Sequence, residues 1–433
     1  MSVETRSQIA GWLLLAMLCL SLLHAYLPAF PAQIAGLCSW LAGALLWPLA
    51  GRTQKTQALL LAGTGLALML WAGLHDGVQI DYARLLTQNL SLISMLAAVS
   101  FLKLVSMPAG RGGHAATGPW AFVRTLFGVH LFGAVINMSA VVIVGDRLAR
   151  RGQIGENTTR LLTCGFASAA LWSPFFAAMA TALLYAPGAR MTDFWPLTLP
   201  LTAFGLLLTF LFARRASADA LAGFRGYPMH FTALWVPALL VFGVLAVHEA
   251  APALSVLTVV TTLAPLLALS VLPLRRGPRR ALRRSRQHIA RGLPMMRGEL
   301  TLFLAAGVLA VGLFAAQSAL GLALPFERFD GAAACATFGV MLLLSYCGVH
   351  AVVSIAAVAA LAAPLAPAPG LMAAMYLMVW GIGAACSPFS GLGLSLQGRY
   401  GLGARQILRW NLRYALIMYA AGCAALLALD GWR

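Results

Sequence analysis

The sequence has 433 residues, of which 61% are hydrophobic and only 10% are charged, and its mean hydropathy is +0.85. This balance excludes a soluble globular protein and predicts a chain that crosses a lipid bilayer several times. The formal net charge of +18 does not indicate a nucleic-acid partner, because Arg and Lys are concentrated in short segments between apolar runs, where membrane topology accounts for them.

The apolar runs have the length that a helix needs to cross a bilayer, roughly 17–25 residues. The first run leads directly into a second one without a small-residue cleavage site, so we expect no cleaved signal peptide. Basic segments mark the cytoplasmic side of the membrane, and Arg6 places the N-terminus there. Four spans then return the chain to the cytoplasm, at residues 11–30, 33–50, 57–74 and 88–106.

The fifth apolar run, residues 122–144, is bounded by basic residues on both sides. These residues are Lys103 and Arg111 before the run and Arg147, Arg150, Arg151 and Arg160 after it. A run whose two ends are both cytoplasmic enters and leaves the membrane on one side, as a re-entrant helical hairpin does. We place the tip of this hairpin at Asn137, Met138 and Ser139, where polar side chains can satisfy backbone groups freed by the turn.

Two further spans complete the first half of the chain. Residues 161–185 cross outward, and the Ser173-Pro174 step interrupts this helix, because proline has no N–H to continue the hydrogen bonding. Residues 194–212 then return the chain to a cytoplasmic segment that is rich in arginine.

The second half follows the same plan in inverted orientation. It begins with three spans, at residues 231–248, 253–274 and 299–323. A hairpin from the periplasmic side follows at residues 332–363, with its tip at Cys347 to His350. The next span, residues 371–396, is interrupted at Ser387-Pro388, and the last one, residues 407–429, ends outside.

Two landmarks support an internal repeat independently of the charges. Residues 168–175 read SAALWSPF and residues 383–389 read GAACSPF, so Ser-Pro-Phe recurs 214 positions apart. The proposed tips at Ser139 and His350 are 211 positions apart. Paired, interrupted segments at corresponding places in two halves indicate a transporter with its site near the bilayer midplane.

These segments predict an all-α polytopic membrane protein of about 11 transmembrane helices plus two re-entrant hairpins in two inverted repeats. A leading transmembrane helix at residues 1–32 precedes the first repeat at residues 33–225 and the second at residues 226–433. The Arg-rich cytoplasmic loop at residues 275–298 is expected to contact anionic lipids. The seven cysteines lie in apolar runs without CxxC spacing, so we expect neither a disulfide framework nor a structural zinc site.

This plan of one leading span and two inverted five-span repeats, each with a hairpin and a Pro-broken helix, resembles the ion transporter superfamily, most closely its divalent anion/sodium symporter branch. The residues that carry the resemblance are Asn137-Met138-Ser139-Ala140 and Gly348-Val349-His350-Ala351 at the tips, and Ser173-Pro174 and Ser387-Pro388-Phe389-Ser390 at the breaks. That branch has Ser-Asn-Thr at each tip, so only Ser139 and the alanines match by type. The resemblance implies an elevator-like movement against a scaffold and a homodimer.

The candidate substrate-binding residues lie at the two tips and the two breaks: Asn137, Met138, Ser139, Ser173, Pro174, Gly348, His350, Ser387, Pro388 and Ser390. Each break frees N–H groups at the start of the following half-helix, whose positive dipole end attracts an anion. The preceding carbonyl groups can coordinate a cation, so we expect a Na+ site near Asn137, Ser173, Gly348 and Ser387. The alternative is that both prolines only kink packed helices.

Each polar side chain at the candidate site has a structural alternative. Asn137 and Ser139 offer donors and acceptors to a ligand, or they cap the hairpin turn without touching one. His350 can take a proton or bind an anion, and a neutral packing histidine is an equal alternative. His130 lies seven residues before Asn137 on the same helical face, and we expect it to pack.

We therefore expect a secondary active transporter of a small anionic solute, coupled to Na+ or H+, in a bacterial-type inner membrane with a cytoplasmic N-terminus and a periplasmic C-terminus. None of the twelve Asp and Glu residues lies in the middle of a predicted span, which disfavours coupling through an intramembrane carboxylate. The sequence has no GxSxG motif and no His/Asp/Glu constellation, so we expect no enzyme. The alternative is a non-transporting structural or assembly subunit of a membrane complex that keeps a transporter-like fold.

Overall fold

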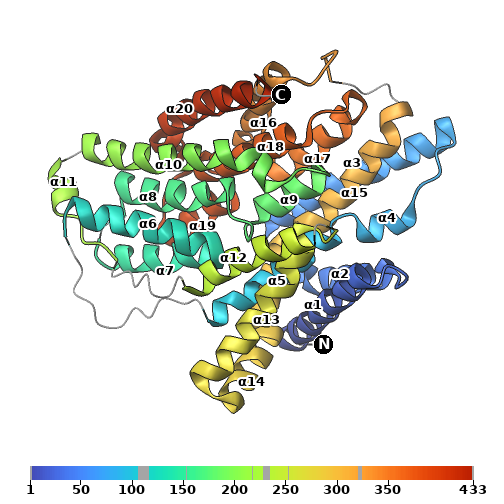
Figure 1. The fold of residues 1–433 in the computed structure, drawn as a ribbon, viewed down its shortest axis with the longest axis horizontal. Helices are drawn as coiled ribbons and strands as arrows, with labels where there is room; N and C mark the ends of the chain where they lie inside the picture. The colour runs from blue at the N-terminus through green and yellow to red at the C-terminus, as the bar shows by residue number, and fades with distance from the viewer. Residues whose placement is uncertain are drawn as a thin grey trace. The chain divides into compact units, whose positions relative to one another are not determined.

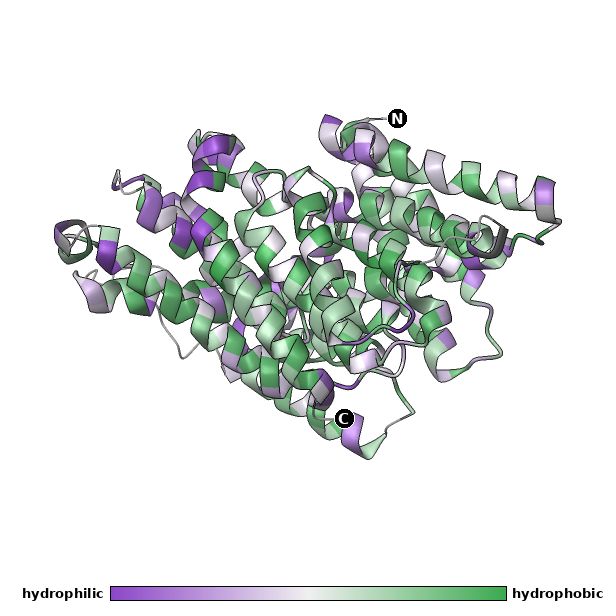
Figure 2. Cartoon of the chain, turned by 90° about the horizontal axis from the view of Figure 1, so that it is seen from above, coloured by the Kyte–Doolittle hydropathy of each residue, from purple (hydrophilic) through white to green (hydrophobic). Residues whose placement is uncertain are grey.

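The computed structural model describes residues 2–105, 117–152, 154–216, 218–227, 235–251, 253–319 and 324–431. These residues are almost entirely helical, and their only paired extended backbone is an isolated bridge between Thr117 and Arg225. Ten of the described segments are long and apolar enough to cross a membrane. Figure 2 shows apolar residues along the helix bodies and hydrophilic residues mainly toward helix ends and connecting segments. The chain is therefore an all-α, multi-pass membrane protein.

The helices form two compact units, and each unit draws on both halves of the chain (Figure 1). Unit 1 comprises Met1–Val105, Val236–Pro325 and Ala356–Pro364. Its helices are α1 (Val3–Tyr26), α2 (Ala32–Leu46), α3 (Arg52–Asp76), α4 (Tyr82–Thr87), α5 (Leu90–Ser100), α12 (Trp235–Ala250), α13 (Val256–Arg276), α14 (Pro278–Gln287) and α15 (Arg297–Ala319).

Unit 2 comprises Ser106–Trp235, Phe326–Ile355 and Leu365–Arg433. Its helices are α6 (Pro119–Ile136), α7 (Met138–Ala149), α8 (Glu156–Ala167), α9 (Ala177–Tyr185), α10 (Met191–Ala216), α11 (Ala218–Ala222), α16 (Gly331–Tyr346), α18 (Pro369–Cys386), α19 (Gly391–Tyr400) and α20 (Ala404–Gly431). Helix α17 (Ala351–Ala362) begins in unit 2 and ends in unit 1. All ten predicted site residues therefore belong to unit 2.

Helices of unit 1 approach one another closely at glycines. α3 and α15 pack together, and a Cβ added at Gly312 would clash with the carbonyl oxygen of Gly65. Gly11 in α1 faces the carbonyl group of Ile289 in the same way. Small residues let membrane helices come near enough for extensive van der Waals contact, which is their main source of attraction in lipid.

Unit 1 departs from the predicted spans at one break. The predicted span at residues 88–106 starts earlier, as α4, and is interrupted before α5 begins at Leu90. Asn89 lies at this interruption, and its buried Nδ2 donates to the carbonyl oxygen of Phe303 at 2.7 Å. This long-range bond satisfies a polar amide group in an apolar interior.

The Arg-rich segment predicted as a loop is helical over most of its length. α13 continues to Arg276, and α14 follows after Gly277. A π-helical turn at His288–Gly292 and a 3-10 turn at Leu293–Met296 then lead into α15. Five arginines of α14 are exposed: Arg279, Arg280, Arg283, Arg284 and Arg286. Arginine is a good helix former, so this arginine-rich connecting segment can be helical without an apolar stripe.

Helix α18 forms the core of unit 2 and packs against α8, α9, α10, α16 and α20. Nearly all of its residues are buried, as expected for a helix that is apolar on every side. Gly381 permits close approach to α8, since a Cβ there would lie 3.2 Å from the carbonyl oxygen of Ala167. α6, α8 and α10 lie side by side in this unit (Figure 1).

The structure has a turn at each of the two predicted tips and a helix interruption at each of the two predicted breaks. α6 and α7 meet at Asn137, whose φ is 52°, and the turn between α16 and α17 contains Gly348, whose φ is 96°. Both angles lie in the left-handed region, which glycine and asparagine tolerate best. The helical segment of α8 and α9 is interrupted at Ser173, and the segment of α18 and α19 is interrupted at Ser387. Re-entrance of the hairpins and inverted orientation of the repeats stay predictions.

Candidate functional site

The hydroxyl of Ser173 joins the first break to the first tip. Its Oγ donates to the carbonyl oxygen of Ala134 at 2.6 Å and accepts from the backbone N–H of Phe175 at 3.2 Å. Ala134 lies three residues before Asn137, and Ser173 is completely buried. One hydroxyl thus satisfies two backbone groups beside the turn and the proline break.

The second break and the second tip have the same arrangement. Ser387 Oγ donates to the carbonyl oxygen of Ser345 at 2.7 Å and accepts from the backbone N–H of Phe389 at 3.2 Å. Ser345 lies three residues before Gly348, which matches the spacing in the first half. The two halves therefore share a local structure, in which a serine at the break holds a carbonyl group beside the tip.

The two breaks differ in their accessibility. At the first break Phe175 and Phe176 are buried, and no side chain caps the start of α9. At the second break Phe389 is 46% exposed, and Ser390 Oγ accepts from the N–H of Gly393 at 3.0 Å, which caps α19. A ligand can therefore reach the start of α19 more readily than the start of α9.

The first tip presents polar groups that are free to bind. Asn137, Met138 and Ser139 are all partly exposed. Within the part of the chain that the structure describes, the side chains of Asn137 and Ser139 form no hydrogen bond. The backbone alone closes the turn, since the N–H of Ala140 donates to the carbonyl oxygen of Asn137 at 3.0 Å. This geometry favours ligand contact over turn capping for both side chains.

His350 caps a helix at the second tip. Its Nδ1 accepts from the backbone N–H of Val352 at 3.3 Å, at the start of α17, and its ring lies edge-on to Trp380 with centroids 5.3 Å apart. Because Nδ1 accepts, the ring proton of the neutral form is on Nε2. This arrangement is the one expected of the neutral packing histidine, which the sequence left as an equal alternative.

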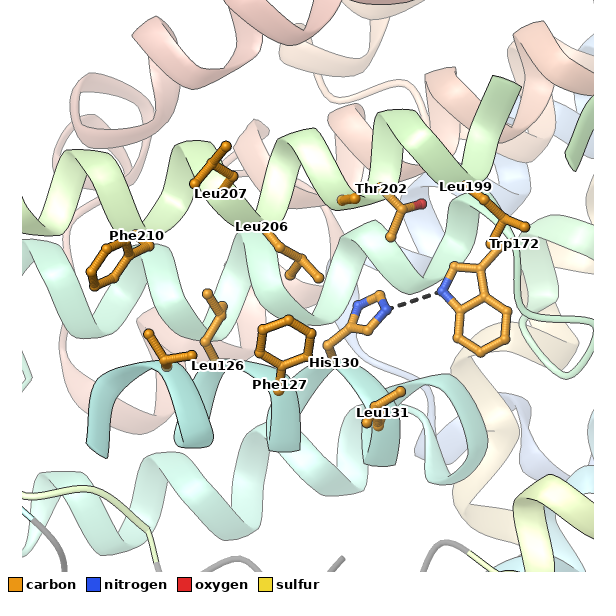
Figure 3. Close-up of a pocket in the computed structure, with 12 residues that line it drawn as sticks. Leu126, Phe127, His130, Leu131, Trp172, Leu199, Thr202, Leu206, Leu207 and Phe210 are labelled. Carbon is orange, nitrogen blue, oxygen red and sulfur yellow. Dashed lines mark hydrogen bonds between the residues drawn. The ribbon is translucent and has the colours of Figure 1, made fainter. Parts of the chain in front are cut away.

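His130 contacts the first break instead of the first tip. The indole N–H of Trp172 donates to His130 Nε2 at 3.0 Å, as the dashed line in Figure 3 shows. The other ring nitrogen, Nδ1, lies 3.1 Å from the carbonyl oxygen of Gly165 and 3.0 Å from Ser168 Oγ. With one nitrogen accepting and the other donating, the imidazole is neutral and fixed in place. This is the expected packing role.

Three oxygen atoms near the predicted Na+ site already have partners. Ser173 and Ser387 both donate their hydroxyl hydrogens to carbonyl groups, and the carbonyl oxygen of Pro388 accepts from Gln397 Nε2 at 2.5 Å. In the described ranges, no group of three or more His, Cys, Asp or Glu side chains could hold a metal ion. A Na+ site near Asn137, Ser173, Gly348 and Ser387 therefore stays a prediction that depends on backbone oxygen atoms.

Two buried polar residues were not singled out from the sequence. Arg160, expected in a cytoplasmic segment, is only 5% exposed, and its Nη2 donates to Glu156 at 2.7 Å and to the carbonyl oxygen of Trp410 at 2.5 Å. Asn411 is completely buried and donates to the carbonyl oxygen of Ala385 at 2.8 Å. The one-turn spacing of Glu156 and Arg160 is a sequence signal for an ion pair. Nothing local predicts the partners of Asn411. Arg160 thus links α8 to α20, and Asn411 links α20 to α18.

An ion pair joins the helix that follows the first tip to the helix that follows the second break. The carboxylate oxygens of Asp146 in α7 accept from Nε and Nη2 of Arg399 in α19, each at 2.6 Å. The Tyr400 hydroxyl adds a bond to Asp146 at 3.1 Å. The hydrogen bonds from Arg399 hold the pKa of Asp146 below its ordinary value.

We expect Asp146→Asn to lower the thermal unfolding midpoint modestly at neutral pH, since both side chains are partly exposed and salt screens the pair. The folded-state pKa of Asp146 lies below its unfolded value of about 4, so the pair stabilises the protein above that pH and is lost as the pH falls through the folded value. The difference between the two proteins should therefore disappear in acid. Arg399→Gln and the double variant complete the cycle, and equal midpoints at neutral pH would contradict a contribution from the pair.

No family model matches the sequence, and no curated protein matches it. Solved structures do match, among them the crystal structure of the YdaH transporter from Alcanivorax borkumensis, which is described as having an unusual topology. The identity is 14%, the match covers 87% of this chain and 85% of that chain, and the TM-score is 0.42. A likeness of this size assigns the chain to no family, and the resemblance to the ion transporter superfamily stays a prediction.

Proposed function

We propose that this membrane protein is a secondary active transporter of a small anionic solute, coupled to Na+ or H+. The observation that carries the proposal is the pair of serine-mediated links between a tip and a proline break, one in each half of the chain. Every helix interruption frees backbone polar groups, which are costly in hydrocarbon. Two matched interruptions are expected where they border a cavity that holds a ligand.

The solute contacts the first tip and the second break in this proposal. Asn137 and Ser139 supply donors and acceptors, because their side chains have no hydrogen-bond partner among the described residues. The start of α19, where Ser390 is partly exposed and Gly391 is exposed, supplies a helix N-terminus. The N–H groups and the positive dipole end of such a helix favour a negatively charged ligand.

The positions of the acidic residues favour coupling without an intramembrane carboxylate. All twelve Asp and Glu residues lie near a helix end or in a connecting segment. Na+ would then be bound by carbonyl and hydroxyl oxygens of the turns, and H+ would need a titratable group such as His350. A direct comparison of Na+ and H+ gradients separates the two forms of coupling.

The division of the chain suits an elevator-type mechanism. Unit 2 contains both tips and both breaks, so one compact body carries every residue of the proposed site. We propose that this body moves across the membrane with its solute, in a homodimer with inverted repeats. The proposed setting is a bacterial-type inner membrane, with the N-terminus in the cytoplasm and the C-terminus in the periplasm.

Thermal unfolding of the purified protein in detergent tests for a ligand. Dicarboxylates, citrate, sulfate and arsenite are added one at a time, with Na+ or with choline. A solute that binds only the folded state stabilises it by about 2.7 kcal/mol at a concentration of 100 times its Kd. We expect one solute to raise the midpoint of the wild type and of Ser270→Ala, an exposed serine in α13, but not of Asn137→Ala or Ser139→Ala. No stabilisation by any solute would favour a non-transporting subunit of a membrane complex.

A further inference from the structure

An apolar groove of about 440 Å³ lies between α6 and α10 in unit 2 (Figure 3). Its walls include Val123, Leu126 and Leu131 of α6 and Ala203, Leu206 and Phe210 of α10. The polar groups at the groove are already engaged: His130 bonds to Trp172, and the Thr202 hydroxyl donates to Thr198 in its own helix at 2.8 Å. The groove therefore offers an apolar wall and suits a hydrocarbon chain.

The groove is open along one side. Phe127, Leu199 and Leu207 line it and are 43%, 43% and 53% exposed. Both α6 and α10 are long and apolar enough to cross the membrane. Apolar side chains that remain exposed on such helices are solvated by lipid.

The two ends of the groove differ in chemistry. α6 and α10 run in opposite directions along it. Phe122 packs near Phe210 with ring centroids 6.4 Å apart, whereas Leu131 and Leu199 lie toward the other end (Figure 3). The end at Phe210 therefore holds the start of α6 and the end of α10. Trp172, which precedes the first break, closes the opposite end.

Exposed arginines gather at the end where α6 begins. Arg124 lies one turn before Phe127 on α6, and Arg214 lies one turn after Phe210 on α10 and is followed by Arg215. All three are exposed, and among the described residues none of them has an acidic partner. Trp120, which is 68% exposed at the start of α6, adds a residue type that concentrates at the level of lipid headgroups.

We propose that this groove binds one acyl chain of an anionic phospholipid, whose phosphate is held by Arg124, Arg214 and Arg215. The guanidinium group matches phosphate in geometry and charge, and basic pockets between membrane helices bind anionic headgroups. The apolar wall contacts the acyl chain and the arginines contact the headgroup, so one ligand explains both features of the groove. This site is separate from the tips and does not depend on the transport proposal.

Lipid binding is measured by native mass spectrometry of the purified protein in mild detergent, with added dioleoyl phosphatidylglycerol or dioleoyl phosphatidylcholine. We expect the wild type to prefer phosphatidylglycerol by at least about thirtyfold, as two or three arginine contacts of about 1 kcal/mol each imply. Arg214→Gln/Arg215→Gln should lose this preference. Ala203→Phe, which fills the groove from an exposed position, should lose the bound lipid of both kinds.

The matched control is Arg279→Gln/Arg280→Gln, which removes two exposed arginines from α14. It should bind phosphatidylglycerol like the wild type. The proposal is overturned if the control loses as much lipid as Arg214→Gln/Arg215→Gln, because the binding then follows total charge. It is also overturned if Ala203→Phe retains the lipid. If Ala203→Phe does not fold, the comparison of lipid binding by Arg214→Gln/Arg215→Gln with that of its control decides the test.

Discussion

Replacing Ser173 or Ser387 with alanine is expected to lower the free energy of unfolding by about 1–3 kcal/mol in each case. Each hydroxyl donates to a carbonyl oxygen, at 2.6 Å for Ser173 and 2.7 Å for Ser387, and accepts from a backbone N–H at 3.2 Å. Both serines are buried, so water cannot replace the lost hydroxyl. Unfolding of the purified variants in detergent measures the loss.

Ser270→Ala is the control for these two variants. Ser270 is exposed on α13, and its Oγ donates only within its own helix, to the carbonyl oxygen of Leu266 at 2.8 Å. Its replacement should change the free energy of unfolding by less than about 0.5 kcal/mol. If the two links are equivalent, Ser173→Ala and Ser387→Ala should lose similar amounts. A large loss at one serine and none at the other would contradict this equivalence.

Gly312→Ala is expected to destabilise unit 1 by about 1–3 kcal/mol, because the added methyl group overpacks the contact between α3 and α15. Its Cβ would clash with the carbonyl oxygen of Gly65 and would lie 2.7 Å from the Gly65 Cα. Both atoms belong to the backbone of a long helix, so the helices must separate to admit the methyl group. Thermal unfolding in detergent shows the effect as a lower midpoint.

Gly63→Ala, on α3 itself, separates this clash from the general effect of glycine on helices. A Cβ at Gly63 meets no atom within 4 Å. Alanine there should be neutral or stabilise the helix by about 0.5–1 kcal/mol, because glycine loses more backbone entropy on folding. An unchanged or higher midpoint for Gly312→Ala would contradict the close packing of α3 against α15.

The sequence predicts most spans of this fold because hydrocarbon thickness fixes the length of a membrane helix. It also predicts the breaks at Ser173 and Ser387, since a proline after each serine removes a backbone donor. The interruption before α5 was not predicted, because the side chain of Asn89 bonds to Phe303, 214 residues away. The helical conformation of the Arg-rich segment is not predicted, because its charges indicate a connection between spans and not the backbone conformation of that connection, although arginine forms helices readily.

At the candidate site, the tips are predictable because polar residues, joined by a glycine at the second tip, interrupt apolar runs there. The partners of each polar group were not predictable, because they come from tertiary packing. The sequence places Ser173 and Ser387 among the ligand contacts, whereas the structure engages both hydroxyls with backbone groups. Likewise, the bond from Trp172 to His130 depends on how α6 packs beside the first break.

Uptake into proteoliposomes under an imposed Na+ or H+ gradient tests the transport proposal most directly. We expect gradient-driven uptake of the solute that stabilises the protein, with little change in Ser270→Ala. In Asn137→Ala/Ser139→Ala, uptake should fall by about tenfold to a hundredfold, because two hydrogen bonds to a charged solute are lost. Uptake that survives in this variant would contradict the proposed site. If the wild type binds a solute but a gradient does not drive its uptake, the result would contradict transport itself.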